Sequence, residues 1–520
     1  MRPLLSLTLA VSTLLISCKP PAKAITPPRE VEASVTEPAE AAVAETPPAP
    51  APDIRSSLVR VNSTQQSWND WQPWEKNAPD SRRALGAIVG PGQVLTTAEL
   101  VHDATYLEFE SADGVRFCQA KVLVADYEAN LALLVAMNEE NGAEFFTATI
   151  PLVPATPSVI GDGLEIVQVE DNGQPIRTQG SLYAVDTVAS LQDQHSFLTY
   201  LVKASMQSAA SSYSLPVLRE GKLAGLLVSY DSKDQVCEVV ATDILSRFLE
   251  SAKTSPYLGF PSLGVATART EDPSFRQWLG LADDQGGIYI KSVQKGSSAE
   301  TAGVKAGDVL LAIDGMSIDR RGYYQDASYD NVFWGHLVRG RKASGETITL
   351  SLLRGKEPVE LTATLSRIEE QARLVPHHLF DRAPNFLVKG GMLFQELSKP
   401  QLEAFGKNWD TNAPLPLLDA FENPDRFEEG RKRIVYLSGV IPTPATVGYE
   451  PLRSLVISKI NGKEIVDMKS AIAAFDSNLG EIHSIEFLDE KLVVYLDDSL
   501  ATAVDGELLK RGMTRLSRSE

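Results

Sequence analysis

Short β-forming segments fill the stretch from Ile54 to about Ala252, and this pattern limits the fold more than any other feature of the sequence. Apolar or alternating runs such as GAIVGPGQVLTTA, TYLEFES and GKLAGLLVSYD are separated by Gly, Asp, Asn and Pro, the residues that mark turns. A helix is expected at the end of the stretch, where ATDILSRFLESA places its apolar residues at helical spacing. Many short strands closed by one helix predict an all-β double barrel.

Length and charge narrow the class of protein further. A chain of 520 residues is too long for one ordinary core, so three or four domains are expected. The formal net charge of −19 argues against a nucleic-acid partner, because such binding needs clustered Lys and Arg to neutralise phosphates.

The first 18 residues, MRPLLSLTLAVSTLLISC, combine a positive start with an apolar run too short for a stable transmembrane helix. Residues 15–18, Leu-Ile-Ser-Cys, resemble a bacterial lipobox, in which Cys18 would be acylated; an ordinary secretory signal with a chance cysteine is the alternative. Lys19 favours the outer membrane. We therefore expect a bacterial envelope protein that is lipid-anchored and faces the periplasm. Residues 19–53 are rich in Pro, Ala and Glu, which predicts a disordered linker.

Two later regions share one skeleton. The elements AGDVLLAIDGMSI and SLVISKINGKEI each hold a tight-turn signal between apolar runs, Asp314-Gly315 in the first and Asn461-Gly462 in the second. An imperfect duplication of one small module is the simplest account.

The order of these parts resembles the HtrA/Deg (Do-like) serine proteases. GAIVGPGQVLTTAELV matches that family's histidine-bearing turn, VLVADYEANLALLVA its aspartate segment, and SSYSLPVLREGKLAGLLVS its nucleophile loop. The tail, with FLVKGGMLFQELSKPQLEAFG, resembles the second PDZ domain of plant-type Deg proteases. The resemblance implies a mainly β protein: a trypsin-like double β-barrel followed by two α+β PDZ domains and preceded by a disordered tether.

Six segments follow from this comparison and from composition. They are 1–18, a lipoprotein signal peptide; 19–53, the linker; 54–253, a degenerate trypsin-like domain; 254–368, the first PDZ domain; 369–382, a connector; and 383–520, the second PDZ domain with a C-terminal extension. An insertion in the last segment, GKNWDTNAPLPLLDAFENPDRFEEGRK, is expected to cover that module.

All three catalytic positions implied by the resemblance have changed. Glu99 stands in place of the histidine, Asn130 in place of the aspartate and Tyr213 in place of the serine. An exposed carboxylate with a pKa of about 4.3 is a poor base at neutral pH, and an amide favours the wrong imidazole tautomer. The tyrosine oxygen lies at the end of a ring and cannot take the attacking position. We therefore expect no intact catalytic site and a pseudoprotease.

A relocated triad is the alternative. His102 lies three positions after Glu99, Asp103 or Asp126 would be the new carboxylate, and serines crowd the nucleophile loop. This alternative predicts a serine endopeptidase of periplasmic protein quality control. The candidate nucleophiles are Ser208, Ser211, Ser212 and Ser214.

The first PDZ domain carries the expected binding site. The segment YLGF, which is Tyr257, Leu258, Gly259 and Phe260, resembles the HtrA carboxylate-binding loop, where a glycine turns backbone N–H groups toward a peptide C-terminus and the next strand accepts the peptide by edge addition. A later insertion adds aromatic residues that are either contact anchors or the apolar stripe of a helix. These residues are Tyr323, Tyr324, Tyr329, Phe333 and Trp334, with Val332 and Leu337 at helical spacing.

No cofactor and no metal ion are expected, because the histidines show no zinc-ligand spacing with cysteine or carboxylate. The pair His377-His378 is interpreted as part of the connector. Cys118 and Cys237 either form a disulfide or remain buried free thiols, and the second state is favoured. The six histidines are His102, His195, His336, His377, His378 and His483.

The expected function is therefore binding without catalysis. The chain would bind extended or C-terminal peptide segments of envelope proteins as a scaffold, adaptor or holdase, or regulate an active protease. A trimer or higher homo-oligomer, or a complex with an active HtrA relative, is compatible with the resemblance, and the segment WNDWQPWEK is a candidate contact. A purely structural envelope protein is a further alternative, which predicts an occluded YLGF groove.

Overall fold

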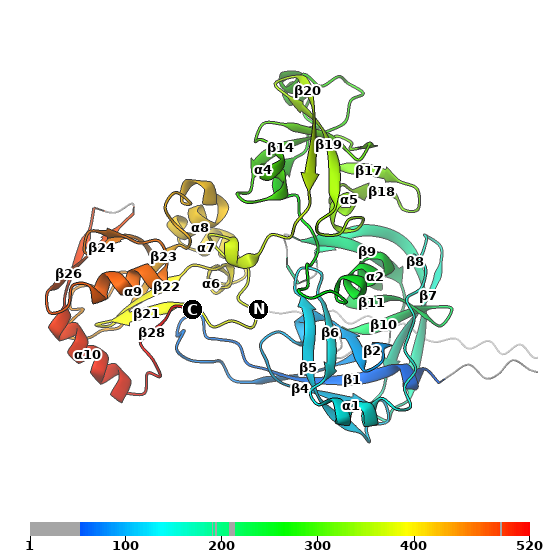
Figure 1. The fold of residues 1–520 in the computed structure, drawn as a ribbon, viewed down its shortest axis with the longest axis horizontal. Coiled ribbons are helices and arrows are strands. Elements are labelled where there is room, and N and C mark those ends of the chain that lie inside the picture. Colours follow the sequence, from blue (N-terminus) through cyan, green and yellow to red (C-terminus); the bar gives the residue numbers. More distant parts are fainter. Residues whose placement is uncertain (1–52, 190, 193–194, 207–213, 489–490) are drawn as a thin grey trace, which may run out of the picture. The chain divides into compact units, whose positions relative to one another are not determined.

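Figure 1 shows the computed structural model of the chain, which describes residues 53–189, 191–192, 195–206, 214–488 and 491–520. These residues belong to one compact unit, Pro52–Glu520. The expected signal peptide, its Cys18 and the linker up to residue 52 lie outside the described residues. Among the described helices, none has the length and apolar character needed to cross a membrane.

The first barrel closes six antiparallel strands in the order β1-β2-β3-β6-β5-β4. Its core contains Ile88, Phe109 and Leu134, all fully buried. Cys118 is buried here as a free thiol. The elements are η1 (Ile54–Ser57), β1 (Leu58–Gln65), β2 (Asp80–Gly90), β3 (Gln93–Thr96), η2 (Ala98–Leu100), β4 (Ala104–Ser111), β5 (Phe117–Asp126), β6 (Leu131–Ala136) and α1 (Glu139–Phe145).

The second barrel also closes six antiparallel strands, in the order β10-β11-β12-β9-β8-β7. A Cβ at Gly225 would lie 2.3 Å from Val239 Cγ1, so the close approach of β11 to β12 requires glycine there. The expected helix forms as α2, and Cys237 is a buried free thiol, so the two cysteines do not pair. The elements are β7 (Gly163–Val169), β8 (Pro175–Ala189), β9 (Ser196–Lys203), β10 (Leu215–Arg219), β11 (Lys222–Asp231), β12 (Val236–Ala241) and α2 (Thr242–Ser251). The double barrel is confirmed.

The first module, residues 254–368, is a sheet in the order β13-β14-β15-β19-β20, with β16 on β15 and a separate hairpin β17-β18. Strand β13 is at the edge of this sheet. The elements are β13 (Val265–Ala268), α3 (Pro273–Leu279), β14 (Ile288–Val293), α4 (Ser298–Ala302), β15 (Val309–Ile313), β16 (Met316–Ser317), β17 (Tyr323–Asp326), β18 (Asp330–Phe333), α5 (Gly335–Arg339), β19 (Thr347–Arg354) and β20 (Glu357–Thr364).

The aromatic insertion forms core, but not as the helix suggested by its spacing. Val332 and Phe333 lie in the hairpin β17-β18, and the helix α5 begins only at Gly335. Tyr324 and Val332 face each other across the hairpin and are buried. The period of two places them on one face of the ribbon, so a strand pair buries them as well as a helix would.

The second module, residues 383–520, is a sheet in the order β27-β26-β24-β23-β22-β21-β28, with β25 on β24. Its insertion forms α7 and α8, which with the connector residues Leu374 and Val375 make a separate apolar cluster. The elements are η3 (Glu370–Ala372) in the connector, then β21 (Phe386–Lys389), β22 (Met392–Glu396), α6 (Lys399–Glu403), α7 (Trp409–Asn412), α8 (Leu415–Glu422), η4 (Pro424–Arg426), β23 (Val435–Val440), β24 (Leu455–Ile460), β25 (Lys463–Glu464), α9 (Met468–Asp476), β26 (Ile482–Phe487), β27 (Val493–Asp497), α10 (Asp498–Lys510) and β28 (Ser517–Arg518).

The tryptophan-rich segment between β1 and β2 packs on this second module. The Trp71 ring meets Phe405 with centroids 5.3 Å apart, and the guanidinium carbon of Arg518 lies 4.1 Å from the Trp68 ring centroid. Gln395 donates a hydrogen bond to the Asp70 carbonyl at 2.9 Å. The segment therefore makes an intramolecular contact.

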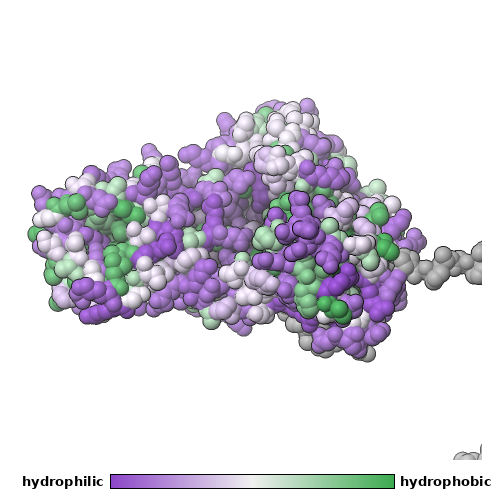
Figure 2. Space-filling view, turned by 60° about the horizontal axis from the view of Figure 1, so that its bottom comes forward, coloured by the Kyte–Doolittle hydropathy of each residue, from purple (hydrophilic) through white to green (hydrophobic). Residues whose placement is uncertain are grey.

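The face shown in Figure 2 is mostly hydrophilic, and its hydrophobic residues gather in small separate groups.

The charge of Asp70 makes this contact pH-dependent. Burial, and next the nearby Glu403, raises the pKa of Asp70 from 3.8 to about 6. Between these values the folded chain binds more protons than the unfolded chain, so this contribution to stability is complete below the lower value and is lost as pH rises through the higher one. The substitution Asp70→Asn has no charge at this position, so it removes the loss of stability at high pH. We expect the variant to melt above the wild type at about pH 8 and together with it near pH 4.

Thermal melts across this pH range test the expectation. Asp410→Asn, which changes an exposed carboxylate in α7, is the matched control and should follow the wild-type profile. A constant difference between Asp70→Asn and the wild type at every pH would contradict the assignment.

Candidate functional site

Two of the three positions that the resemblance implies, Glu99 and Asn130, come together in the first barrel. Glu99 lies in η2, and its backbone N–H donates to Asn130 Oδ1 at 2.9 Å. Asn130 is buried and has a left-handed φ of 52°, a conformation that asparagine tolerates. The Glu99 carboxylate lies 3.4 Å from Arg82 Nη1, and the Glu99 carbonyl accepts from Gln65 at 2.8 Å. Tyr213, the third position, lies outside the described residues.

Ser214 is the one candidate nucleophile within the described residues, and it is committed to a structural role. Its side chain is fully buried, and Oγ donates to the Leu85 carbonyl at 2.8 Å. Its Oγ also lies 3.1 Å from Thr96 Oγ1. A hydroxyl held in this way has no access to a substrate. Ser208, Ser211 and Ser212 lie outside the described residues.

The histidine and carboxylate of the relocated triad do meet. His102 Nδ1 lies 3.1 Å from Asp103 Oδ2. The Asp103 backbone N–H donates to Asp381 at 2.7 Å, and the Asp381 backbone N–H donates back to Asp103 at 2.9 Å. The His102 ring packs on Phe380 with centroids 4.7 Å apart. Both groups are therefore tied to the connector.

The connector covers the surface beside Glu99. Phe380 packs against Tyr127 at 4.8 Å between ring centroids and against His378 at 4.8 Å. The Tyr127 hydroxyl donates to the Asp381 carboxylate. Burial, and next Asp381, raises the pKa of Tyr127 above its ordinary value. Residues 378–381 thus cover the surface next to the turn that holds Glu99 and His102.

The YLGF loop lies against the barrels. The Tyr257 hydroxyl donates to Asp126 at 2.8 Å, and the buried Phe260 ring meets Phe197 at 4.9 Å between centroids. Leu258 is 50% exposed and is the one side chain of the loop that faces solvent. Gly259 has a φ of 67°, the turned backbone that the resemblance implies.

Buried charges fasten the first module to the first barrel. Asp126 and Glu128 have exposed side-chain fractions of 0% and 3%. Arg367 lies 3.4 Å from each, and Arg339 lies 3.0 Å from Glu128. Although burial opposes the charged form, the two carboxylates raise the pKa of Arg367 above its ordinary value. Asp126 also accepts from the Ala129 backbone at 2.9 Å, so it serves this cluster and not a relocated triad.

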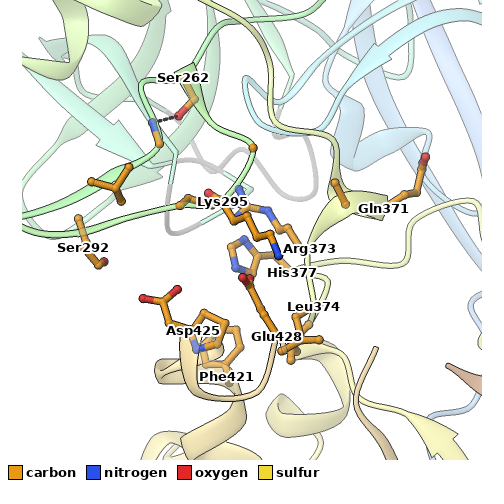
Figure 3. A pocket seen from close by; sticks show the side chains of 18 of the residues that line it. Ser262, Ser292, Lys295, Gln371, Arg373, Leu374, His377, Phe421, Asp425 and Glu428 are labelled. Carbon is orange, nitrogen blue, oxygen red and sulfur yellow. Dashed lines mark hydrogen bonds between the residues drawn. The ribbon is translucent and has the colours of Figure 1, made fainter. Parts of the chain in front are cut away.

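A cleft of about 1400 Å³ opens beside strand β13. One wall is residues 262–267, which include the edge strand, and the side chains of Phe333, Trp334 and Val338 also line the cleft. The connector and the second module complete it, and Figure 3 shows Lys295, Arg373, Asp425 and Glu428 around the same opening. A free strand edge beside apolar side chains is the arrangement that accepts an extended peptide.

One buried donor in this cleft has no acceptor. The Trp334 side chain is 8% exposed, and its Nε1 makes no hydrogen bond within the described part of the chain. An unpaired buried N–H is costly, so a ligand carbonyl or carboxylate at this point would satisfy it. Sequence analysis placed Trp334 among the aromatic residues of the insertion but could not assign this role.

The second module also has a glycine turn, and this turn already binds a carboxylate of the same chain. Its turn, Gly390 and Gly391, has φ angles of 62° and 102°. The Gly390 backbone N–H donates to the Asp505 carboxylate of α10 at 2.7 Å, and its carbonyl accepts from Thr443 at 2.7 Å. The N–H of this turn is therefore already bound to a carboxylate of the chain itself.

Comparisons with known proteins agree with this architecture. Family models described as PDZ domain match residues 375–520 and 289–328. Protease Do-like 2, chloroplastic, of Arabidopsis thaliana is 23% identical over 445 residues, 84% of this chain and 71% of that protein. Putative protease Do-like 3, mitochondrial, of the same plant is 22% identical over 462 residues, which cover 88% of this chain and 78% of that protein. A solved HtrA-type protease, AlgW with decapeptide, aligns at 19% identity and a TM-score of 0.45, covering 61% of this chain and 97% of that one.

The buried charge cluster predicts a large effect for one substitution. Arg367→Met would leave Asp126 and Glu128 buried with part of their compensation removed, and we expect a loss of about 3 kcal/mol in the free energy of unfolding. The control Arg177→Met removes a pair with Glu165 in which Arg177 is 47% exposed, and should cost less than about 1 kcal/mol. Urea unfolding measures both, and equal effects would contradict the role of the cluster.

Proposed function

Because the chain is a relative of the HtrA/Deg serine proteases and carries PDZ domains, we propose that it binds extended or C-terminal peptide segments of envelope proteins in the cleft beside β13, and that it does not cleave them. Such a protein would act as a scaffold, adaptor or holdase, or as the regulatory partner of an active relative. The observation that carries the proposal is that an edge strand and a buried indole donor, unpaired among the described residues, line the same cleft.

The strand edge supports binding by β-addition. Among the described residues, strand β13 pairs with β14 on one side only, so its other edge has backbone groups that an added strand can match. Phe333 and Val338 provide apolar surface beside it, and Trp334 provides the donor. Main-chain hydrogen bonds would give affinity, and these side chains would give selectivity.

The catalytic positions support loss of cleavage. Glu99 and Asn130 bind each other through the backbone of Glu99, and neither supplies an imidazole. Ser214 is buried and hydrogen-bonded, and the alternative pair of His102 and Asp103 is tied to the connector. No geometry in the described residues therefore favours the endopeptidase alternative.

The proposed site of action is the bacterial envelope. The lipobox-like sequence ending at Cys18 is its support, and it would fix the chain to a membrane with the folded part in the periplasm. The outer membrane remains the favoured address. Association into a trimer or higher oligomer, or with an active HtrA relative, belongs to the same proposal.

Peptide binding is tested with the full chain and a library of peptides with free C-termini. We expect binding, and Trp334→Phe should weaken the tightest peptide by roughly three- to tenfold, because one hydrogen bond is lost. Trp278→Phe is the matched control: Trp278 is 66% exposed on α3 and does not line the cleft. Titration calorimetry gives both affinities. Absence of any peptide ligand, or equal effects of the two variants, would rule out the cleft as the site.

Loss of catalysis is tested separately. The purified chain should leave casein intact and should not react with a fluorophosphonate, which labels only an activated serine. An active serine protease serves as the positive control for both assays. Labelling that disappears when Ser211 and Ser212 are replaced by alanine would instead establish the relocated triad.

A further inference from the structure

Three side chains that are distant in sequence meet at the wall of the cleft. His195 immediately precedes β9 of the second barrel, Glu370 begins η3, and His377 follows in the connector. One nitrogen of each imidazole and one carboxylate oxygen all lie within 4.8 Å of one another. His195 and His377 also line the cleft, and Figure 3 shows His377 at its wall.

The imidazoles have unused nitrogens. The His195 side chain is 5% exposed, and neither ring nitrogen has a hydrogen-bond partner in the described ranges. His377 Nδ1 is also buried without a hydrogen-bond partner among the described residues. It lies 3.7 Å from Glu370 Oε1, which is too far for a hydrogen bond. His195 Nδ1 also lies 3.6 Å from Glu128 Oε2, again too far for a hydrogen bond. Buried polar atoms are nearly always paired, so a guest between the two imidazoles and Glu370 would satisfy nitrogens that have no partner among the described residues.

Two hydrogen bonds fix the orientation of the Glu370 carboxylate. The His377 backbone N–H donates to Glu370 Oε2 at 2.7 Å, and Arg373 Nε donates to Oε1 at 2.7 Å. Each carboxylate oxygen has more than one lone pair, so both can still accept a ligand bond. Outer contacts of this kind fix the position of metal ligands in proteins.

The nearby arginines do not prevent a metal cation from binding. Arg373 is paired with Glu370, while Arg339 and Arg367 are paired with Glu128. Each guanidinium thus already has a carboxylate beside it, which reduces its repulsion of an added ion. The cleft gives an ion a path to His195 and His377 from solvent.

We propose that His195, His377 and Glu370 form a binding site for a divalent transition-metal ion of the zinc type. Two imidazoles and one carboxylate suit Zn²⁺, Co²⁺ or Ni²⁺, whereas Mg²⁺ and Ca²⁺ prefer oxygen ligands throughout. The sequence did not predict this site, because its ligands show no local spacing and come from the barrel and the connector. A bound ion would cross-link these two parts and stabilise the folded chain.

The test uses the full chain freed of metal with a chelator. Co²⁺, whose absorption reports coordination, should bind with a stoichiometry of about one per chain and be displaced by Zn²⁺ but not by Mg²⁺. His195→Gln and Glu370→Gln should each weaken binding by more than about tenfold, since even outer contacts of metal sites contribute that much. The melting temperature should rise with Zn²⁺ in the wild type and not in these variants.

His102→Gln is the matched control, because it removes an imidazole beside a carboxylate outside the cluster and should leave Co²⁺ binding unchanged. Melting of the metal-free variants shows whether each is folded, and Glu370→Gln, in the connector, decides the result if His195→Gln is not. Failure of the wild type to bind Co²⁺, or affinity unaffected by both ligand variants, would overturn the proposal. Peptide binding is measured independently of metal, so the two proposals can fail separately.

Discussion

Two carboxylates buried at the end of β5 and in the turn after it, Asp126 and Glu128, hold the first module on the first barrel. A buried negative charge is tolerated only when cations and hydrogen bonds compensate for it. Arg339 and Arg367 of the first module provide the cations, and Tyr257 provides a hydroxyl. The module is therefore held in place because the buried carboxylates of the barrel need its cations. Its strand β13 and helix α5 line the cleft as a result.

The connector makes a comparable contact with the first barrel beside Glu99. Here Phe380 packs on His102 and Tyr127, and the backbone N–H groups of Asp103 and Asp381 each donate to the other residue's carboxylate. The surface around His102 and Tyr127 is therefore used for packing within the chain.

The sequence alone predicted the parts whose signals are local. Turn residues between short apolar runs indicated both barrels, and the quoted motifs located Glu99 and Asn130, which the fold brings into contact. Of the two alternatives for the insertion before α5, the helical stripe is wrong, because the spacing of Val332, Phe333 and Leu337 fits a helix and a hairpin followed by a helical turn equally well. The grouping of His195 with His377, and the unpaired state of Trp334 Nε1, depend on contacts between segments far apart in the chain. No local spacing encodes such contacts.

The Asp505 carboxylate that accepts from Gly390 has a consequence for selectivity between the two modules. A ligand that belongs to the same chain is present at its site at a high effective concentration, of the order of millimolar for a flexibly linked partner and greater for one held on a folded helix. A free peptide would need to outcompete it. In the second module the turn at Gly390 therefore holds helix α10 in place, whereas in the first module β13 is an edge strand of the described sheet.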